Sequence, residues 1–153
     1  MIQRPRTTIA LLALSASALV GIVSHEGYTD VATIPVPGDV PTIGFGTTHG
    51  VKLGDRITPP KALARTLADV QRDEGAIKRC VTVPLYQHEY DAYVDLAYNI
   101  GDRAFCSSTL VAKLNRQDYA GACAQILHWD KFHGRVLRGL TLRRQDEYKE
   151  CMG

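Results

Sequence analysis

Residues 26–48, EGYTDVATIPVPGDVPTIGFGTT, constrain the fold more than any other part of the chain. A single glutamate directly follows an apolar stretch, and two short β-prone stretches, 32–34 and 42–44, flank Pro37-Gly38-Asp39. Proline, glycine and aspartate in succession are a strong turn signal. The segment therefore predicts a helix that ends near Glu26 and a β-hairpin after it, so that the carboxyl group faces a strand carrying the hydroxyl of Thr42.

The composition is that of an ordinary soluble domain. With 153 residues, 45% hydrophobic and 22% charged, the chain suits one domain with a real core. A net charge of +2 is too small and too dispersed to indicate nucleic acid, but it is compatible with an anionic polymer such as a bacterial cell wall.

The remainder of the chain predicts mostly helices. Thr58 before Pro59-Pro60 is a helix start signal, and apolar residues recur at helical spacing up to Arg79. A more apolar helix over 86–98 should form the buried centre and end near Gly101. Shorter helices are expected over 108–114, 118–128 and 141–150. The predicted fold class is α+β, mostly helical, with one small hairpin.

The N-terminus carries an uncharged segment, 7–24, preceded by Arg4 and Arg6. Its eighteen residues just reach the length that spans a bilayer, and the arginines predict a cytoplasmic N-terminus with an exported body. Ten of the eighteen are Thr, Ala, Ser or Gly, which makes a permanent anchor weak. Cleavage as a signal peptide at Ala16-Ser17-Ala18 is a second interpretation. It would remove most of the helix that supports Glu26.

Four cysteines, Cys80, Cys106, Cys123 and Cys151, are spaced by 26, 17 and 28 residues. The sequence contains no C-x-x-C and no histidine at zinc-finger spacing, so we do not expect a metal site. An even number of cysteines in an exported domain predicts two disulfides, for which three pairings are possible.

Several landmarks in order resemble the phage lysozymes of glycoside hydrolase family 24. They are E-G…T-I-G-F-G from Glu26, L-A-Y-N-I-G at 96–101, F-C-S-S-T-L at 105–110 and G-L-T-L-R-R at 139–144. The resemblance covers residues 20–153. It implies a two-lobed lysozyme-like fold, with a small β-hairpin lobe, a helical C-terminal lobe and a cleft between them. It also implies the sequential pairs Cys80–Cys106 and Cys123–Cys151, each joining neighbouring helices.

The resemblance further implies an endolysin, an N-acetylmuramoylhydrolase that cleaves β-1,4 bonds between N-acetylmuramic acid and N-acetylglucosamine. Its partners would be peptidoglycan glycan strands and, transiently, the inner membrane through residues 7–24. We expect a monomer that needs no metal or organic cofactor and binds no nucleic acid. As in some family members, residues 1–24 would act as a signal-anchor-release segment that leaves the membrane and refolds. Residues 25–153 would form the catalytic domain in the periplasm, and we favour this interpretation over cleavage.

The apolar stretch before Glu26 gives its carboxyl group the partly buried setting of a general acid, and we assign it that role. The resemblance marks Thr42, the threonine that opens T-I-G-F-G, as a second site residue, whereas for the water the family normally uses an aspartate. The family's aspartate, six residues before that threonine, is replaced here by Val36. Three alternatives follow: Asp39 acts as base or electrostatic support, Thr42 orients the water alone, or Asp30 folds over from the helix end.

Two rival functions stay open. A lytic transglycosylase needs only one carboxylic acid, and a wall-binding module would need none. Arg143 and Arg144 match a family motif, and we expect them to pair with a buried carboxylate such as Glu147 or Asp91, or to line the cleft.

Overall fold

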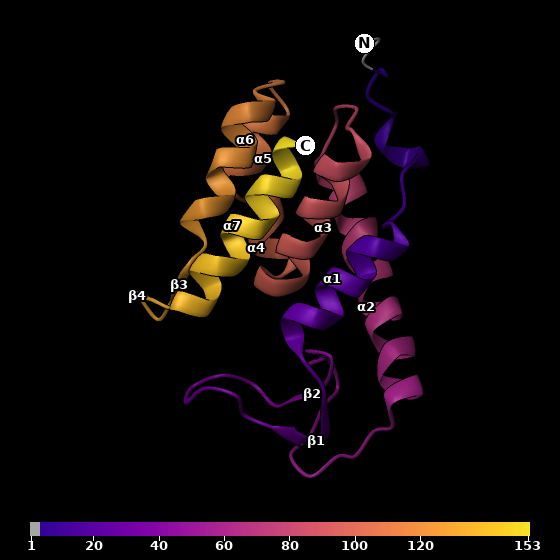
Figure 1. The fold of residues 1–153 in the computed structure, drawn as a ribbon, viewed down its shortest axis with the longest axis vertical. Helices are drawn as coiled ribbons and strands as arrows, with labels where there is room; N and C mark the ends of the chain where they lie inside the picture. The colour runs from indigo at the N-terminus through magenta and orange to yellow at the C-terminus, as the bar shows by residue number, and fades with distance from the viewer. Residues whose placement is uncertain (1–3) are drawn as a thin grey trace. The chain divides into compact units, whose positions relative to one another are not determined.

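The computed structural model describes residues 4–153, and within it the chain forms two compact units. One unit consists of residues 19–72, and the other combines residues 4–18 with residues 73–153. Two helices, α1 and α2, run from one unit into the other (Figure 1). The first three positions of the predicted segment 1–24 lie outside the described residues.

The unit of residues 19–72 contains the predicted hairpin. Its strands, β1 (Thr29–Thr33) and β2 (Thr42–Gly44), are antiparallel, with Thr33 opposite Thr42 and Thr29 opposite Gly44. The register shifts between these two pairs, so the ladder is irregular. Strand β2 is where the sequence predicted it, whereas β1 starts three residues earlier than the β-prone stretch 32–34. Backbone bonds from Ala32 to Asp55 and from Ile57 to Asp30 pair β1 with the following loop, which propensity alone does not reveal.

The first long helix, α2 (Pro59–Cys80), begins directly after Thr58, as predicted. Val70 and Ile77 are fully buried, whereas Leu63 and Leu67 at the N-terminal end are each 44% exposed. The apolar spacing therefore identified the helix correctly, but only its C-terminal half has a fully buried apolar stripe.

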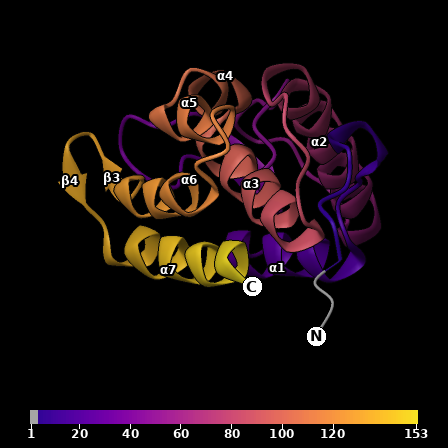
Figure 2. The ribbon, with the colours of Figure 1, turned by 90° about the horizontal axis from the view of Figure 1, so that it is seen from above.

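The helical unit is built around α3 (Gln87–Ile100), which lies beside α7 (Arg138–Met152) (Figure 2). The apolar residues that predicted a buried central helix are all fully buried: Tyr90, Tyr93, Val94, Leu96 and Ala97. Gly101 ends α3 with a φ of 90°, which favours glycine. Helices α5 (Thr109–Leu114) and α6 (Tyr119–Gln125) pack against each other, and a 3-10 turn, η2 (Ile126–His128), follows.

Three short elements, one helix and two strands, were not predicted. Helix α4 (Asp102–Cys106) has five residues, and strands β3 (Lys131–Phe132) and β4 (Arg135–Val136) have two each. Elements of this length contain too few residues for an apolar period to be visible.

Both predicted disulfides are present in the sequential pairing. Cys80 at the end of α2 bonds Cys106 in α4, and Cys123 in α6 bonds Cys151 in α7. Each bond joins two helices of the helical unit, and this confirms the pairing that the resemblance implied.

The N-terminal segment contains a 3-10 turn, η1 (Ile9–Leu11), and then helix α1 (Ala16–Glu26). The Ser15 hydroxyl accepts the backbone N–H of Ala18, as an N-cap does, at 3.1 Å. Among the residues that the structure describes, no helix combines the length and the apolar character needed to cross a bilayer.

Candidate functional site

Glu26 is the last residue of α1, where the sequence predicted a helix end. Gly27 follows with a φ of 68°, and its N–H still bonds Val23 O at 3.1 Å, so the chain leaves the helix through a left-handed glycine. The Glu26 side chain is half-buried. Of the apolar residues before it, Ile22 is fully buried, whereas Val20 is 62% exposed.

The Glu26 carboxyl group lies against Gly46, directly beyond β2. A methyl group on Gly46 would lie 2.7 Å from Glu26 Oε2 and 2.9 Å from its carboxyl carbon, which is closer than any real contact. Gly46 also has a φ of 83°, a conformation that other residues rarely adopt. The backbone therefore favours glycine here, and any larger residue would have to displace the Glu26 carboxyl group.

The loop that carries Gly46 is held in a tight turn. Ile43 and Thr47 exchange two backbone hydrogen bonds of 3.0 Å, and Ile43 is buried. The Thr47 hydroxyl, also buried, donates to Asp69 Oδ2 in α2 at 2.8 Å. Gly44 packs so closely on Ala62 of α2 that a methyl group at this position would lie 2.8 Å from the Ala62 Cβ. These contacts fix the loop, and hence the surroundings of Glu26, to the first half of α2.

Thr42 and Asp39 are both engaged locally in the hairpin. The Thr42 hydroxyl donates to Val40 O at 3.1 Å, and Asp39 Oδ1 accepts the N–H of Val40 at 2.8 Å. The backbone N–H of Asp39 bonds Val36 O at 3.0 Å, which closes the predicted turn. Asp39 therefore has the contacts of a turn-forming residue, and both side chains are half-buried.

Asp30 lies on β1, with its side chain 68% exposed. Its carboxylate lies 3.9 Å from Nη1 of Arg56. The structure thus places Asp30 beside a surface arginine at the edge of the hairpin. Val36, at the position of the missing aspartate, is exposed in the turn region.

Arg143 and Arg144 form a buried charged cluster in the helical unit. Arg143 donates to Glu147 at 3.1 Å and to Asp95 at 2.7 Å, and Arg144 donates to Asn99 at 2.8 Å. The predicted partner Glu147 is confirmed. The carboxylate from α3 is Asp95 rather than Asp91, which lies one turn earlier and accepts the N–H of Ser15 instead.

Comparison with known proteins decides the family. The model of the family described as phage lysozyme matches residues 23–147, which contain Glu26, the hairpin and both arginines. The chain belongs to the phage lysozyme family.

Relatives of the chain include named endolysins. It is 42% identical over 110 residues to an endolysin of Acyrthosiphon pisum secondary endosymbiont phage 1, covering 69% of this chain and 75% of that protein. It is 36% identical over 141 residues to a SAR-endolysin of Pseudomonas phage phiKMV, covering 90% and 87%. Among solved structures, a mutant of P22 lysozyme matches with a TM-score of 0.77 and 32% identity over 94% of this chain and 100% of that chain.

Membership places the chain among peptidoglycan-degrading glycosidases with a mostly helical, lysozyme-like fold and one small hairpin. Two residues around Glu26 were missed from the sequence, namely Gly46 and Thr47. The second glycine of T-I-G-F-G was a visible signal for a special backbone position. The bond from Thr47 to Asp69 spans 22 residues and had no local signal.

Proposed function

We propose that this chain is an endolysin that hydrolyses the β-1,4 bond between N-acetylmuramic acid and N-acetylglucosamine, and so lyses the host cell. The observation that carries the proposal is the Glu26 carboxyl group, which lies against the Gly46 backbone at the base of the hairpin that carries Thr42. The names of the relatives, endolysin and lysozyme, support the substrate class.

In the proposed reaction Glu26 donates its proton to the glycosidic oxygen as the bond to the leaving sugar breaks. A water molecule attacks the anomeric carbon from the opposite face and loses a proton to solvent as the new C–O bond forms. Thr42 is our first candidate to orient this water, because its hydroxyl oxygen keeps acceptor capacity while its hydrogen bonds Val40 O. We assign Asp39 first to the turn, since its carboxylate accepts the N–H of Val40.

Substituting Glu26 with glutamine tests the proposal. The amide keeps the shape of the side chain but has no proton to transfer, and general acid catalysis contributes typically ~10²–10⁴-fold. We expect the purified variant to retain the thermal transition of the wild type while peptidoglycan turnover falls by about that factor. A variant with more than about a tenth of wild-type turnover would overturn the assignment.

The products separate hydrolysis from the transglycosylase alternative. Mass spectrometry of the released muropeptides should show hydrated reducing ends. Products lighter by one water would indicate a transglycosylase, in which the sugar's own hydroxyl closes an intramolecular ring. If no soluble muropeptides are released from purified cell walls, the chain would be a wall-binding module and not an enzyme.

We further propose that residues 7–24 first hold the chain in the host inner membrane and that the chain is then released into the periplasm. Two observations support release over cleavage. The phiKMV relative, named a SAR-endolysin, matches over 90% of this chain. In addition, cleavage after Ala18 would remove Ile9, Leu12 and Ala18 itself, three side chains that are buried in the folded chain.

A further inference from the structure

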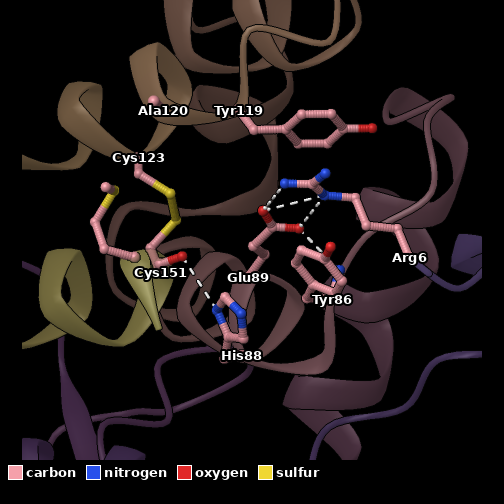
Figure 3. A pocket seen from close by; sticks show the side chains of 9 residues that line it. Arg6, Tyr86, His88, Glu89, Tyr119, Ala120, Cys123 and Cys151 are labelled. Carbon is pink, nitrogen blue, oxygen red and sulfur yellow. Dashed lines mark hydrogen bonds and ion pairs between the residues drawn. A yellow bond between two sulfur atoms is a disulfide. The ribbon is translucent and has the colours of Figure 1, made fainter. Parts of the chain in front are cut away.

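The structure holds the side chain of Arg6 in a built site on the helical unit. Its guanidinium lies between two aromatic rings, 4.3 Å from the ring centre of Tyr86 and 3.5 Å from that of Tyr119 (Figure 3). Its Nη2 and Nε donate to the two carboxylate oxygens of Glu89, at 2.8 Å to Oε1 and 3.0 Å to Oε2. The Glu89 side chain is only 4% exposed, and that of Arg6 is 27% exposed.

This site fits a guanidinium better than an ammonium group. A planar fork matches both oxygens of a carboxylate and stacks on aromatic faces, which a lysine does not do. The ring faces attract the cation further. Glu89 raises the pKa of Arg6 through this hydrogen bond, although burial opposes the shift. A pocket of about 160 Å³ beside the guanidinium is lined in part by Tyr86, Tyr119 and the Cys123–Cys151 disulfide.

The residues after Arg6 continue along the same unit as a strap, which we define as residues 6–15. Thr7 and Leu85 exchange two backbone hydrogen bonds, of 2.8 and 2.9 Å. Farther along, Leu14 N–H donates to Glu74 at 2.7 Å and Ser15 N–H donates to Asp91 at 3.0 Å. Two apolar side chains of the strap, Ile9 and Leu12, are buried.

Three carboxylates on α2 and α3 thus receive donors from the strap: Glu74, Glu89 and Asp91. Glu89 and Asp91 are almost completely buried. A buried carboxylate that loses its charged or polar partner is costly, because desolvation is no longer compensated. Undocking the strap removes the guanidinium of Arg6 from Glu89. The buried carboxylate still accepts the backbone N–H of Tyr86 but has lost its cationic partner.

We propose that Glu89, Tyr86 and Tyr119 form a receptor site for Arg6, and that docking of the strap on this site holds the N-terminal segment outside the membrane after release. The proposal rests on the signal-anchor release proposed above. In the membrane-held form Arg6 lies on the cytoplasmic side, and carrying its charge across the bilayer is unfavourable. In the docked form Arg6 binds a carboxylate and two ring faces of the receptor site, and these contacts oppose reinsertion of the N-terminal segment into the membrane. Because the receptor residues belong to the helical unit, the strap can dock only where that unit has folded.

Hydrogen exchange of the purified, full-length soluble chain tests the receptor without a membrane. The amide protons of Thr7, Leu14 and Ser15 report strap docking because each donates a hydrogen bond to the helical unit. Glu89→Gln keeps an acceptor for the N–H of Tyr86 and removes the charge that Arg6 binds. We expect exchange at Thr7 to accelerate by at least about ten-fold, the effect of losing a hydrogen bond between charged groups.

Arg4→Gln is the matched control, since it removes an exposed arginine two residues away and should leave exchange at Thr7 unchanged. Arg6→Gln should reproduce the effect of Glu89→Gln, and the double variant should exceed neither single variant. If Glu89→Gln lowers the thermal transition of the whole chain, Tyr119→Leu and Arg6→Lys probe the same site from its aromatic and its cationic side. Unchanged hydrogen exchange at Thr7 in the folded variants would overturn the proposal that this site binds Arg6.

Fractionation of Gram-negative cells that express the full-length chain tests the role in release. Glu89→Gln leaves residues 1–24 unaltered, and we expect it to raise the membrane-held share several-fold over wild type. Normal fractionation of a variant with faster exchange would overturn the role in release. A wild-type chain that is never membrane-held, or is always shortened, would overturn the signal-anchor function itself, and exchange at Thr7 would still report on the receptor.

Discussion

The carboxyl group of Glu26 occupies the space into which a side chain at Gly46 would project, so the candidate acid and the loop after β2 are fitted to each other. Gly46→Ala should therefore damage activity out of proportion to stability. The added methyl group must push the carboxyl group away, and a displacement of about 1 Å can cost ~10²-fold in rate. Turnover on purified peptidoglycan and the thermal transition should be measured together.

Gly50→Ala is the control for this substitution. Gly50 has a φ of 68°, but a methyl group there would meet no atom within 4 Å. It should therefore show the backbone strain of a left-handed alanine, about 1–2 kcal/mol, with activity retained. Equal activity losses in both variants would show that backbone strain, and not the contact with Glu26, is responsible.

The hairpin offers a paired test of the second group in the reaction. Asp39→Asn keeps an oxygen that can accept the N–H of Val40, so the turn should persist while the charge is removed. We expect this variant to retain turnover within several-fold. Thr42→Val removes the hydroxyl and should lower turnover by about the ~10²-fold typical of a lost positioning contact. A loss of that size in Asp39→Asn, with Thr42→Val active, would assign the water to Asp39.

Much of this arrangement could be predicted from the sequence because its signals are local. The turn at Pro37-Gly38-Asp39, the start of α2 after Thr58 and the apolar run of α3 each lie within a few residues of the element that they specify. In the β3–β4 turn His133 and Gly134 both have positive φ. This turn was not predicted because two-residue strands show no alternation of apolar and polar residues.

The long-range contacts could not be predicted in the same way. Arg6 binds Glu89, which lies 83 residues later in the sequence, and no local sequence pattern around either residue indicates the other. The choice of Asp95 over Asp91 as partner of Arg143 depends on where α7 crosses α3, which residue spacing on one helix does not determine. The contact of Glu26 with Gly46 likewise depends on the course of the loop in three dimensions.

The two disulfides should stabilise the helical unit without acting as a switch. Each typically contributes ~2–4 kcal/mol by restricting the unfolded chain. Cys80→Ser with Cys106→Ser, and separately Cys123→Ser with Cys151→Ser, should lower the thermal transition while the folded enzymes stay active. Neither residues 1–24 nor the hairpin contains a cysteine, so thiol treatment should not activate the wild type. Activity that appears only after reduction would contradict this account.

Leucines at three exposed positions should convert the weak membrane segment into a firm anchor. Ala10, Ala13 and Ala16 all point to solvent in the folded chain, so leucine at these positions should not disturb the released form. Leucine contributes roughly −0.3 to −0.6 kcal/mol at the centre of a membrane helix, so the triple variant favours insertion by about that amount per site. We expect an exported, membrane-held chain of full length that does not lyse cells. The same variant, purified from detergent and refolded without lipid, should hydrolyse peptidoglycan, which separates tethering from misfolding. A shortened, soluble and active product in the periplasm would instead establish cleavage.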